Sequence, residues 1–449
     1  MHFIRKIADL KKSHLFNRIC FVALILFSQS VTGENKKNNE FKSDYKLNDS
    51  IPKNEFLIGI FWGPVWEHTN DHQYQVIKDA NVDYIQNVLS SGMNTEEKNL
   101  KMLDLAREHG LKIYVADPRV KGSDDEIKAM VNTYKTHPAT AGYYIVDEPD
   151  VKGMDWAADT YKKILSSDHQ KVPYVNLLPE WAVKDYEKNY VDQWIAKIGK
   201  ENLKYLSFDN YPFMEDGSFR ESYFKNLDII RRAALENKLK TSCYLQSVGI
   251  PGAYRRPDEH ELRYSAYASV AYGITNIVWF TYWTPTNRGE KFSTAIIDAD
   301  GNKTDLYDHF KQINGELKQL GKLLVDLDAK AVYHSGTTLP DGVPRLVDGF
   351  FWQPIQKSDD MIISHFVNQS SGRNYIMVVN KSVKDQKQFS FKLQNSIKKV
   401  LLISKATDSK SSVTSLKTNY RHKTGIISDT FLPGEGKLYE LKAEFESQK

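Results

Sequence analysis

The tetrapeptide Val146-Asp147-Glu148-Pro149 follows directly on an apolar run that begins at Ala141. Two adjacent carboxylates before a proline are unfavourable in a hydrophobic core, but they suit the end of a strand in a parallel barrel, where such folds present catalytic groups. A carboxyl group beside a like charge has a raised pKa, so Glu148 is predicted to be a proton donor and Asp147 its charged neighbour. The alternative is that both residues only cap the next helix, because acidic side chains stabilise a helix start.

The elements around these carboxylates decide whether they share one site. Successive strand residues point to opposite sides of a sheet, so both side chains reach the same site only if the strand ends between them. From residue 56 the chain repeats one unit, an apolar strand followed by a polar turn and a helical pattern. The predicted strands are Phe56–Trp62, Val82–Leu89, Lys112–Asp117, Ala141–Glu148, Pro173–Leu178, Tyr205–Tyr211, Lys240–Gln246 and Asn276–Trp283. Near-continuous apolar strands that alternate with helices indicate a parallel sheet covered on both faces, and eight such units predict an α/β fold, a (β/α)8 TIM barrel.

The helical stretches Glu96–His109 and Glu259–Tyr272 each precede a glycine, the residue favoured at a helix C-terminus. An amphipathic helix over Thr304–Leu327 is predicted to close the eighth unit. Beyond it, short strands with turn residues between them predict a C-terminal all-β sandwich, most clearly at Asn374–Asn380, Gln388–Leu393, Lys399–Ile403 and Lys437–Leu441. The predicted divisions are a signal peptide at 1–33, a disordered lead-in at 34–54, the barrel at 55–329 and the sandwich at 330–449.

The N-terminal segment has the pattern of an export signal. Basic residues precede the apolar run Ile19–Phe27 and small or polar residues follow it, so the mature chain is predicted to be periplasmic or extracellular. The run is much shorter than the ~20 apolar residues that a membrane span needs. Without the signal, Cys243 is the one remaining cysteine, and no internal disulfide is expected. The net charge of +4 is spread along the chain with no basic tract beyond the N-terminus, which argues against nucleic acid as a partner and leaves the oligomeric state open.

Polar and aromatic side chains gather at the carboxyl ends of the predicted strands, where barrels place their active sites. Asp209, on the sixth strand, is the leading candidate for a second catalytic carboxylate. The predicted substrate-binding residues are Trp62, Trp66, Asn87, Asn176, Tyr211, Gln246, Tyr282 and Trp283. Carboxylates, carboxamides and indoles at one rim suit a carbohydrate, held by hydrogen bonds and stacking. No glycine-rich phosphate loop follows a strand, and no third ligand accompanies His68 and His72, so neither a cofactor nor a metal is predicted.

Cleavage of a glycosidic bond ordinarily needs two carboxyl groups, one to protonate the leaving oxygen and one to attack or to activate water. The barrel resembles the clan A glycoside hydrolases, particularly the family 42 type, which carry the acid/base glutamate in an Asn-Glu-Pro-like motif at the end of strand four. Glu148 falls on that position, with Asp147 in place of the usual Asn. The stretches 296–304 and 307–314 also resemble the segment after strand eight of such enzymes. The resemblance implies an exported glycoside hydrolase that cleaves O-glycosidic bonds of an oligo- or polysaccharide, with Glu148 as general acid/base.

The chain departs from that pattern at strand seven, where the clan carries its nucleophilic glutamate and this sequence has Gln246. A carboxamide is too weak a nucleophile to form a covalent intermediate, and three interpretations remain. Asp209 could be the second carboxylate, and the spacing of the carboxyl groups would then separate inversion from retention. The substrate could instead supply its own nucleophile through a 2-acetamido group, because Asp147-Glu148-Pro149 resembles the Asp-Glu pair at strand four of substrate-assisted families such as 20 and 123. The third interpretation is a non-hydrolytic glycan-binding barrel that has lost its nucleophile.

Overall fold

The computed structural model describes residues 55–89, 93–286, 289–406, 414–416 and 425–443. The predicted signal peptide and lead-in (1–54) lie outside the described residues and remain predictions. None of the described helices combines the length and the apolar character that a membrane-spanning helix requires.

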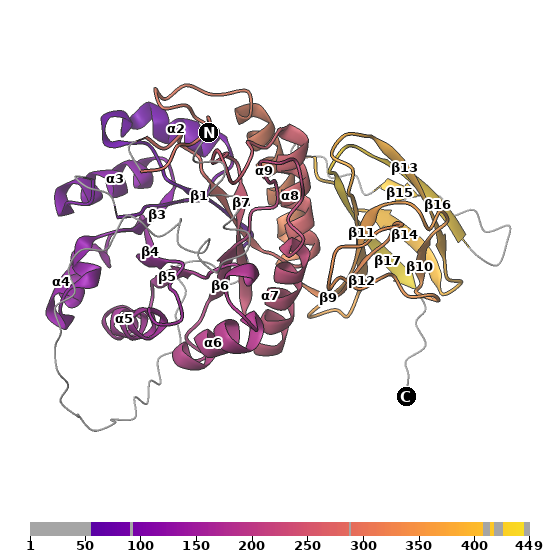
Figure 1. The fold of residues 1–449 in the computed structure, drawn as a ribbon, viewed down its shortest axis with the longest axis horizontal. Coiled ribbons are helices and arrows are strands. Elements are labelled where there is room, and N and C mark those ends of the chain that lie inside the picture. The colour runs from indigo at the N-terminus through magenta and orange to yellow at the C-terminus, as the bar shows by residue number, and fades with distance from the viewer. Residues whose placement is uncertain (1–54, 90–92, 287–288, 407–413, 417–424, 444–449) are drawn as a thin grey trace, which may run out of the picture.

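Eight parallel strands form the first part of the chain, as predicted, and each is followed by a helix (Figure 1). The strands are β1 (Leu57–Phe61), β2 (Tyr84–Gln86), β3 (Lys112–Val115), β4 (Thr140–Asp147), β5 (Val172–Asn176), β6 (Tyr205–Asp209), β7 (Lys240–Gln246) and β8 (Asn276–Phe280). Their order is β5-β4-β3-β2-β1-β8-β7-β6. The ladder between β5 and β6 is reduced to a bridge between Leu177 and Phe208, so the barrel is nearly closed.

Of the eight described helices that surround the barrel, four begin with a side-chain cap. The eight helices are α2 (Asp71–Asp79), α3 (Glu96–Glu108), α4 (Asp124–Tyr134), α5 (Met154–Ser167), α6 (Asp192–Ile198), α7 (Tyr223–Asn237), α8 (Glu259–Ala271) and α9 (Tyr307–Leu324). Capping boxes start α4, at Ser123 and Glu126, and α8, at Asp258 and Glu261. Gly110, just beyond α3, has a φ of 64° that most other residues would adopt only with strain.

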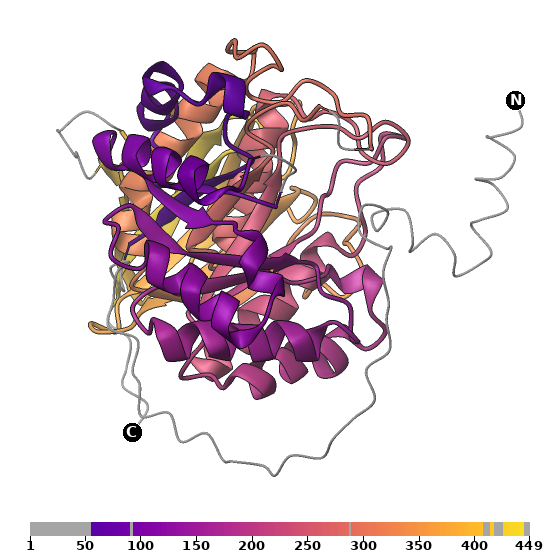
Figure 2. The same ribbon diagram turned by 90° about the vertical axis from the view of Figure 1, so that its left-hand side faces the viewer.

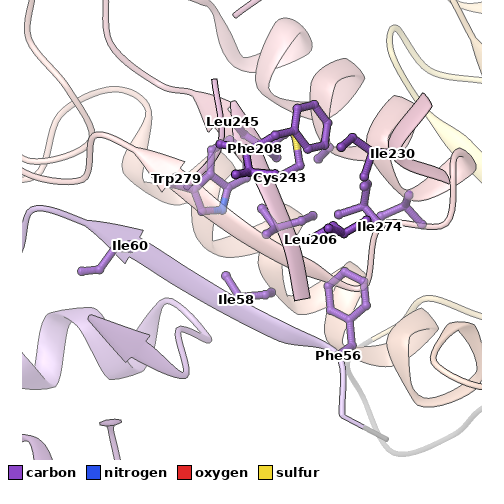
Figure 3. Close-up of a cluster of buried hydrophobic side chains, with 14 of the residues drawn as sticks. Phe56, Ile58, Ile60, Leu206, Phe208, Ile230, Cys243, Leu245, Ile274 and Trp279 are labelled. Carbon is purple, nitrogen blue, oxygen red and sulfur yellow. The ribbon is translucent and has the colours of Figure 1, made fainter. Parts of the chain in front are cut away.

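The barrel strands bury both faces, which explains why they are apolar almost throughout. Figure 3 shows the outer layer, in which side chains of β1, β6, β7 and β8, including Ile58 and Leu245, pack towards the helices. Cys243 lies in this layer as a buried small hydrophobe, and burial raises the pKa of its thiol. The inner layer fills the barrel and is rich in tyrosine, with Tyr84, Tyr114 and Tyr174 in edge or tilted ring contacts.

Two antiparallel sheets follow the barrel. One contains β9 (Leu327–His334), β11 (Met361–Asn368), β12 (Asn374–Asn380), β14 (Ile397–Leu402), β15 (Thr414–Leu416) and β17 (Gly436–Ala443), and the other contains β10 (Trp352–Pro354), β13 (Lys387–Leu393) and β16 (Gly425–Phe431). They enclose a second core around Trp352 and Tyr439. The six-stranded sheet also packs against α8 of the barrel, and Figure 2 shows both sheets behind the barrel, away from β3 and β4.

Candidate active site

The end of β4 brings two adjacent carboxylates to the same side of the chain. Asp147 is the last residue of the strand, and Glu148 has a φ of 47°, in the left-handed region. The backbone N–H of Glu148 donates to the carbonyl of Asn176 at 2.9 Å, which holds this turn beside β5. The extended conformation therefore ends between the two residues, the condition under which both can face one site. A left-handed conformation at a residue other than glycine costs about 1 kcal/mol or more and is often found at functional sites.

Glu148, Asp147 and Asp209 converge at the carboxyl end of the barrel, from β4 and β6. The carboxyl groups of Glu148 and Asp209 share a hydrogen bond, and Tyr211 is a second hydrogen-bond partner of Asp209. The side-chain Nδ2 of Asn176 donates to Asp147 Oδ1 at 3.2 Å and to Asp209 Oδ1 at 3.3 Å, so it links the two aspartates. Among the predicted site residues, the structure thus groups these three carboxylates with Asn176 and Tyr211.

The amide of Asn176 is itself held in place from below. Its Oδ1 accepts a hydrogen bond from Ser207 Oγ at 3.1 Å, and the Ser207 hydroxyl lies 2.7 Å from the hydroxyl of Tyr174. All three residues are buried in the barrel. These hydrogen bonds fix the orientation of the Asn176 amide: its oxygen accepts from Ser207, so its nitrogen is the atom directed towards the aspartates.

The surroundings of the carboxylates favour their protonated forms. Burial and the charges of Asp209 and Asp147 raise the pKa of Glu148 well above its ordinary value. The hydrogen bond that Glu148 and Asp209 share raises the pKa of Glu148 and lowers that of Asp209. Burial, with the charge of Asp209, raises the pKa of Asp147 to about 7, and burial raises the pKa of Asp209 to about 6. Asp147 is exposed to solvent and Glu148 is half-buried. The burial that raises their pKa values therefore comes from the many protein atoms around the open mouth of the barrel.

These raised pKa values predict that the stability of the fold decreases as the pH rises. Such an acid binds its proton more tightly in the folded than in the unfolded chain, so its stabilising contribution is complete at low pH and is lost through the folded pKa, about 6 for Asp209 and about 7 for Asp147. We expect the free energy of unfolding to fall between about pH 4 and 8, and to fall by about 2 kcal/mol less in Asp209→Asn. Urea unfolding across this range measures the effect, and identical pH profiles for both chains would contradict it.

Gln246 ends β7, as predicted, but its side chain hydrogen-bonds to the backbone of two loops. Its Oε1 accepts from the Phe213 N–H at 3.0 Å, and its Nε2 donates to the carbonyls of Phe213 at 3.2 Å and Arg255 at 2.8 Å. The side chain is buried, with 1% of its surface exposed. The carboxamide therefore joins the loop after β6 to the loop after β7, and its role as a substrate contact stays a prediction.

Replacing Gln246 by Glu is expected to destabilise the fold rather than to supply a nucleophile. The carboxylate would face two carbonyl oxygens and lose both donated hydrogen bonds, so we expect a loss of about 3 kcal/mol in the free energy of unfolding. Denaturant unfolding measures this loss, with Gln356→Glu, at an exposed position, as the matched control. A Gln246→Glu chain as stable as the control would contradict this role of the amide.

The predicted aromatic residues are spread over several environments. Trp62 is half-buried at the top of the inner barrel layer and contacts Phe280 and Phe292, at ring distances of 5.7 Å and 5.8 Å. Tyr282 and Trp283 are buried in the layer between the strands and the helices. β8 ends at Phe280, three residues before the predicted end, so these two residues belong to the following turn and are not grouped with the carboxylates.

Two further predicted residues make their contacts with other parts of the barrel. Trp66 lies in a short 3-10 helix after β1, where the ammonium groups of Lys98 and Lys101 lie 4.6 Å and 5.2 Å from the centre of its ring. The Asn87 amide is directed towards Met102 of α3, with Nδ2 3.6 Å from the sulfur. Their part in substrate binding stays a prediction that no contact with the carboxylates supports.

Sequence reasoning missed Gln86, the last residue of β2. Its side chain is fully buried, and neither its amide oxygen nor its nitrogen has a hydrogen-bond partner among the described residues. Strand alternation with Tyr84 directs it into the barrel. The sequence pattern that identified Asn176 and Asp209, a polar residue at the end of an apolar strand, also applies to Gln86. Within the described part of the chain, no group of three or more His, Cys, Asp or Glu side chains is arranged to hold a metal ion.

No family model and no curated protein matches this sequence. The structure is similar to that of a catalytic mutant of a GH42 β-galactosidase from G. stearothermophilus, with a TM-score of 0.54 and 9% identity, over 89% of this chain and 100% of that one. A family 39 glycoside hydrolase from the gut symbiont Bacteroides cellulosilyticus WH2 aligns with a TM-score of 0.49 and 10% identity, over 88% of this chain and 82% of that one.

A β-galactosidase from the psychrophilic Marinomonas ef1 aligns with a TM-score of 0.46 and 12% identity, over 60% of this chain. This chain covers 62% of that protein, less than two thirds of its length. At these identities the likeness concerns the fold, and the TM-score of 0.54 supports a (β/α)8 barrel followed by antiparallel sheets. The chain is thus similar in fold to that GH42 β-galactosidase.

Proposed function

We propose that this chain is a glycoside hydrolase in which Glu148 donates a proton to the oxygen of the leaving group. The convergence of Glu148, Asp147 and Asp209 at the carboxyl end of the barrel is the observation that carries the proposal, because neighbouring negative charges raise the pKa of Glu148. A carboxylic acid that stays protonated near neutral pH is what general-acid cleavage of a glycoside requires. The exported location and a carbohydrate chain as substrate are parts of the same proposal.

The contact between Glu148 and Asp209 argues against a two-carboxylate mechanism. Carboxyl groups that share a hydrogen bond touch each other, so neither a sugar ring nor a water molecule fits between them. A retaining pair needs about 5–5.5 Å between its carboxyl groups, and an inverting pair needs about 6.5–9.5 Å so that water fits between them. Asp209 therefore suits the role of holding and tuning the Glu148 proton better than the role of nucleophile or of base towards water.

A substrate that carries its own nucleophile fits this geometry best. In the step we propose, the carbonyl oxygen of a 2-acetamido group attacks the anomeric carbon while the bond to the leaving oxygen breaks and that oxygen takes the Glu148 proton. Water then opens the cyclic intermediate and returns a proton to Glu148. Asp147 is exposed at the mouth of the barrel, linked to Asn176, and is suited to orient the acetamide N–H.

Paired nitrophenyl glycosides that differ only in a 2-hydroxyl or a 2-acetamido group test the proposal. We expect hydrolysis of at least one 2-acetamido sugar and much slower hydrolysis of its 2-hydroxy partner. Hydrolysis confined to 2-hydroxy sugars would instead support Asp209 as the second carboxylate, in a conformation with the two carboxyl groups further apart. Binding of glycans without hydrolysis of any would support a barrel that has lost catalysis, consistent with Gln246 on β7.

A further inference from the structure

A guanidinium group lies beside the candidate active site without a carboxylate partner. Arg220, in the loop between β6 and α7, makes no ion pair with any residue that the structure describes, whereas Arg119, Arg231, Arg232, Arg255 and Arg256 each pair with an acid. Arginine is rarely left half-buried without an anion, because its charge is costly to remove from water. Arg220 is therefore available to pair with an anion that is not part of the chain.

The structure holds the Arg220 guanidinium in one orientation. Its Nε donates to the backbone carbonyl of Tyr211 at 3.1 Å, and its Nη2 donates to the Tyr254 hydroxyl at 3.2 Å. The guanidinium carbon lies 4.9 Å from the centre of the Trp181 ring and 5.6 Å from that of Tyr254. Of the five N–H groups of an arginine, these two hydrogen bonds use two, so three remain for a ligand.

The residues around Arg220 belong to three loops at the carboxyl end of the barrel. Trp181 follows β5, Arg220 follows β6 and Tyr254 follows β7. Trp181 keeps 39% of its surface exposed, so part of its ring stays accessible beside the cation. Tyr211 connects this place to the carboxylates, because its hydroxyl contacts Asp209 while its backbone carbonyl accepts from Arg220.

We propose that Arg220 binds an anionic substituent of the sugar, a carboxylate or a sulfate ester, next to the bond that is cleaved. A fixed fork of N–H donors matches the two oxygens of a carboxylate or a sulfate. The carboxylates of the proposed site would repel such a group. Arg220 provides the opposite charge, and Tyr211 contacts both Arg220 and Asp209. This inference rests on the proposed function for the identity of the site as a sugar site, but its test does not need hydrolysis.

Calorimetric titration of the full-length Glu148→Gln chain tests the binding of the anion directly. The ligands are the methyl glycosides of glucuronic and galacturonic acid, each with its uncharged methyl ester, and glucose 6-sulfate with glucose. We expect at least one anionic member to bind ~10–100-fold more tightly than its neutral partner. Replacement of Arg220 by Gln should remove that preference, while Arg256→Gln, which breaks a surface pair with Asp305, should keep it.

The outcomes separate this inference from the proposed function. A preference for the uronates alone identifies a carboxylate as the ligand, and a preference for the 6-sulfate alone identifies a sulfate. Equal or weaker binding of every anionic member, or a preference that survives Arg220→Gln, would overturn the inference even if the wild-type chain hydrolyses neutral glycosides. Binding lost in Arg220→Gln, together with no hydrolysis by the wild type, would support the anion site and refute the proposed function. A thermal melt of Arg220→Gln within about 2 °C of the wild type excludes a general loss of folding.

Discussion

Replacement of Glu148 by Gln is expected to lower kcat/KM by about 10²–10⁴-fold on a glycoside whose leaving group is another sugar. A sugar alkoxide leaves slowly unless its oxygen is protonated, and the amide of Gln has no proton of suitable acidity to give. Gln keeps the size of Glu148 and can still hydrogen-bond to Asp209, so the loss should appear in kcat more than in KM. Initial rates over a range of substrate concentrations, for both chains, measure the effect.

Glu215→Gln is the matched control for this substitution. Glu215 is exposed and lies in the loop after β6, where its backbone N–H donates to the carbonyl of Ala253. Its replacement should leave kcat/KM unchanged. An equal loss of kcat/KM in both variants would show that a general disturbance of the loops, and not the loss of the Glu148 proton, lowers the activity.

Replacement of Asp209 by Asn is expected to move the alkaline limb of the pH–rate profile to lower pH by about one unit or more. The charge of Asp209 raises the pKa of Glu148, and so does its acceptance of the Glu148 hydrogen bond. Without the negative charge Glu148 ionises more easily, and the protonated acid that the reaction needs is lost at a lower pH. The profile of kcat against pH measures the shift independently of any change in maximal rate.

Asp147→Asn gives the comparison for that shift. The charge of Asp147 also raises the pKa of Glu148, but less than that of Asp209, so its removal should move the limb in the same direction by a smaller amount. An unchanged limb in Asp209→Asn, or a movement to higher pH, would mean that the two carboxyl groups are not coupled during catalysis.

Much of the candidate site could be predicted from where polar residues stand in apolar strands. Asp147, Asn176 and Asp209 all lie at carboxyl ends of parallel strands, and the closure of the barrel brings them together. The same rule misled for Tyr282 and Trp283, because the apolar run of β8 continues past Phe280 into a turn that packs outward. The alternation of apolar and polar residues does not show where an apolar run stops being a strand. The ends of strands are therefore predicted less accurately than the strands themselves.

The parts of the site that sequence could not supply depend on loop conformation. The hydrogen bonds of Gln246 to Phe213 and Arg255, and the position of Arg220 between Trp181 and Tyr254, join loops that are far apart in the chain. Loops have no periodic pattern from which such contacts follow. The contact between Glu148 and Asp209 likewise depends on the left-handed turn after Asp147, for which the sequence offers only the following proline as a hint.

The most direct test of Glu148 as the proton donor compares wild type and Glu148→Gln on one sugar with leaving groups of different basicity. Nitrophenolate leaves without protonation, whereas methanol or a second sugar does not. We therefore predict that the substitution reduces kcat/KM only slightly for the nitrophenyl glycoside and about 10²–10⁴-fold for the methyl glycoside or disaccharide. A loss of the same size for every leaving group would contradict a proton transfer from Glu148 to the departing oxygen.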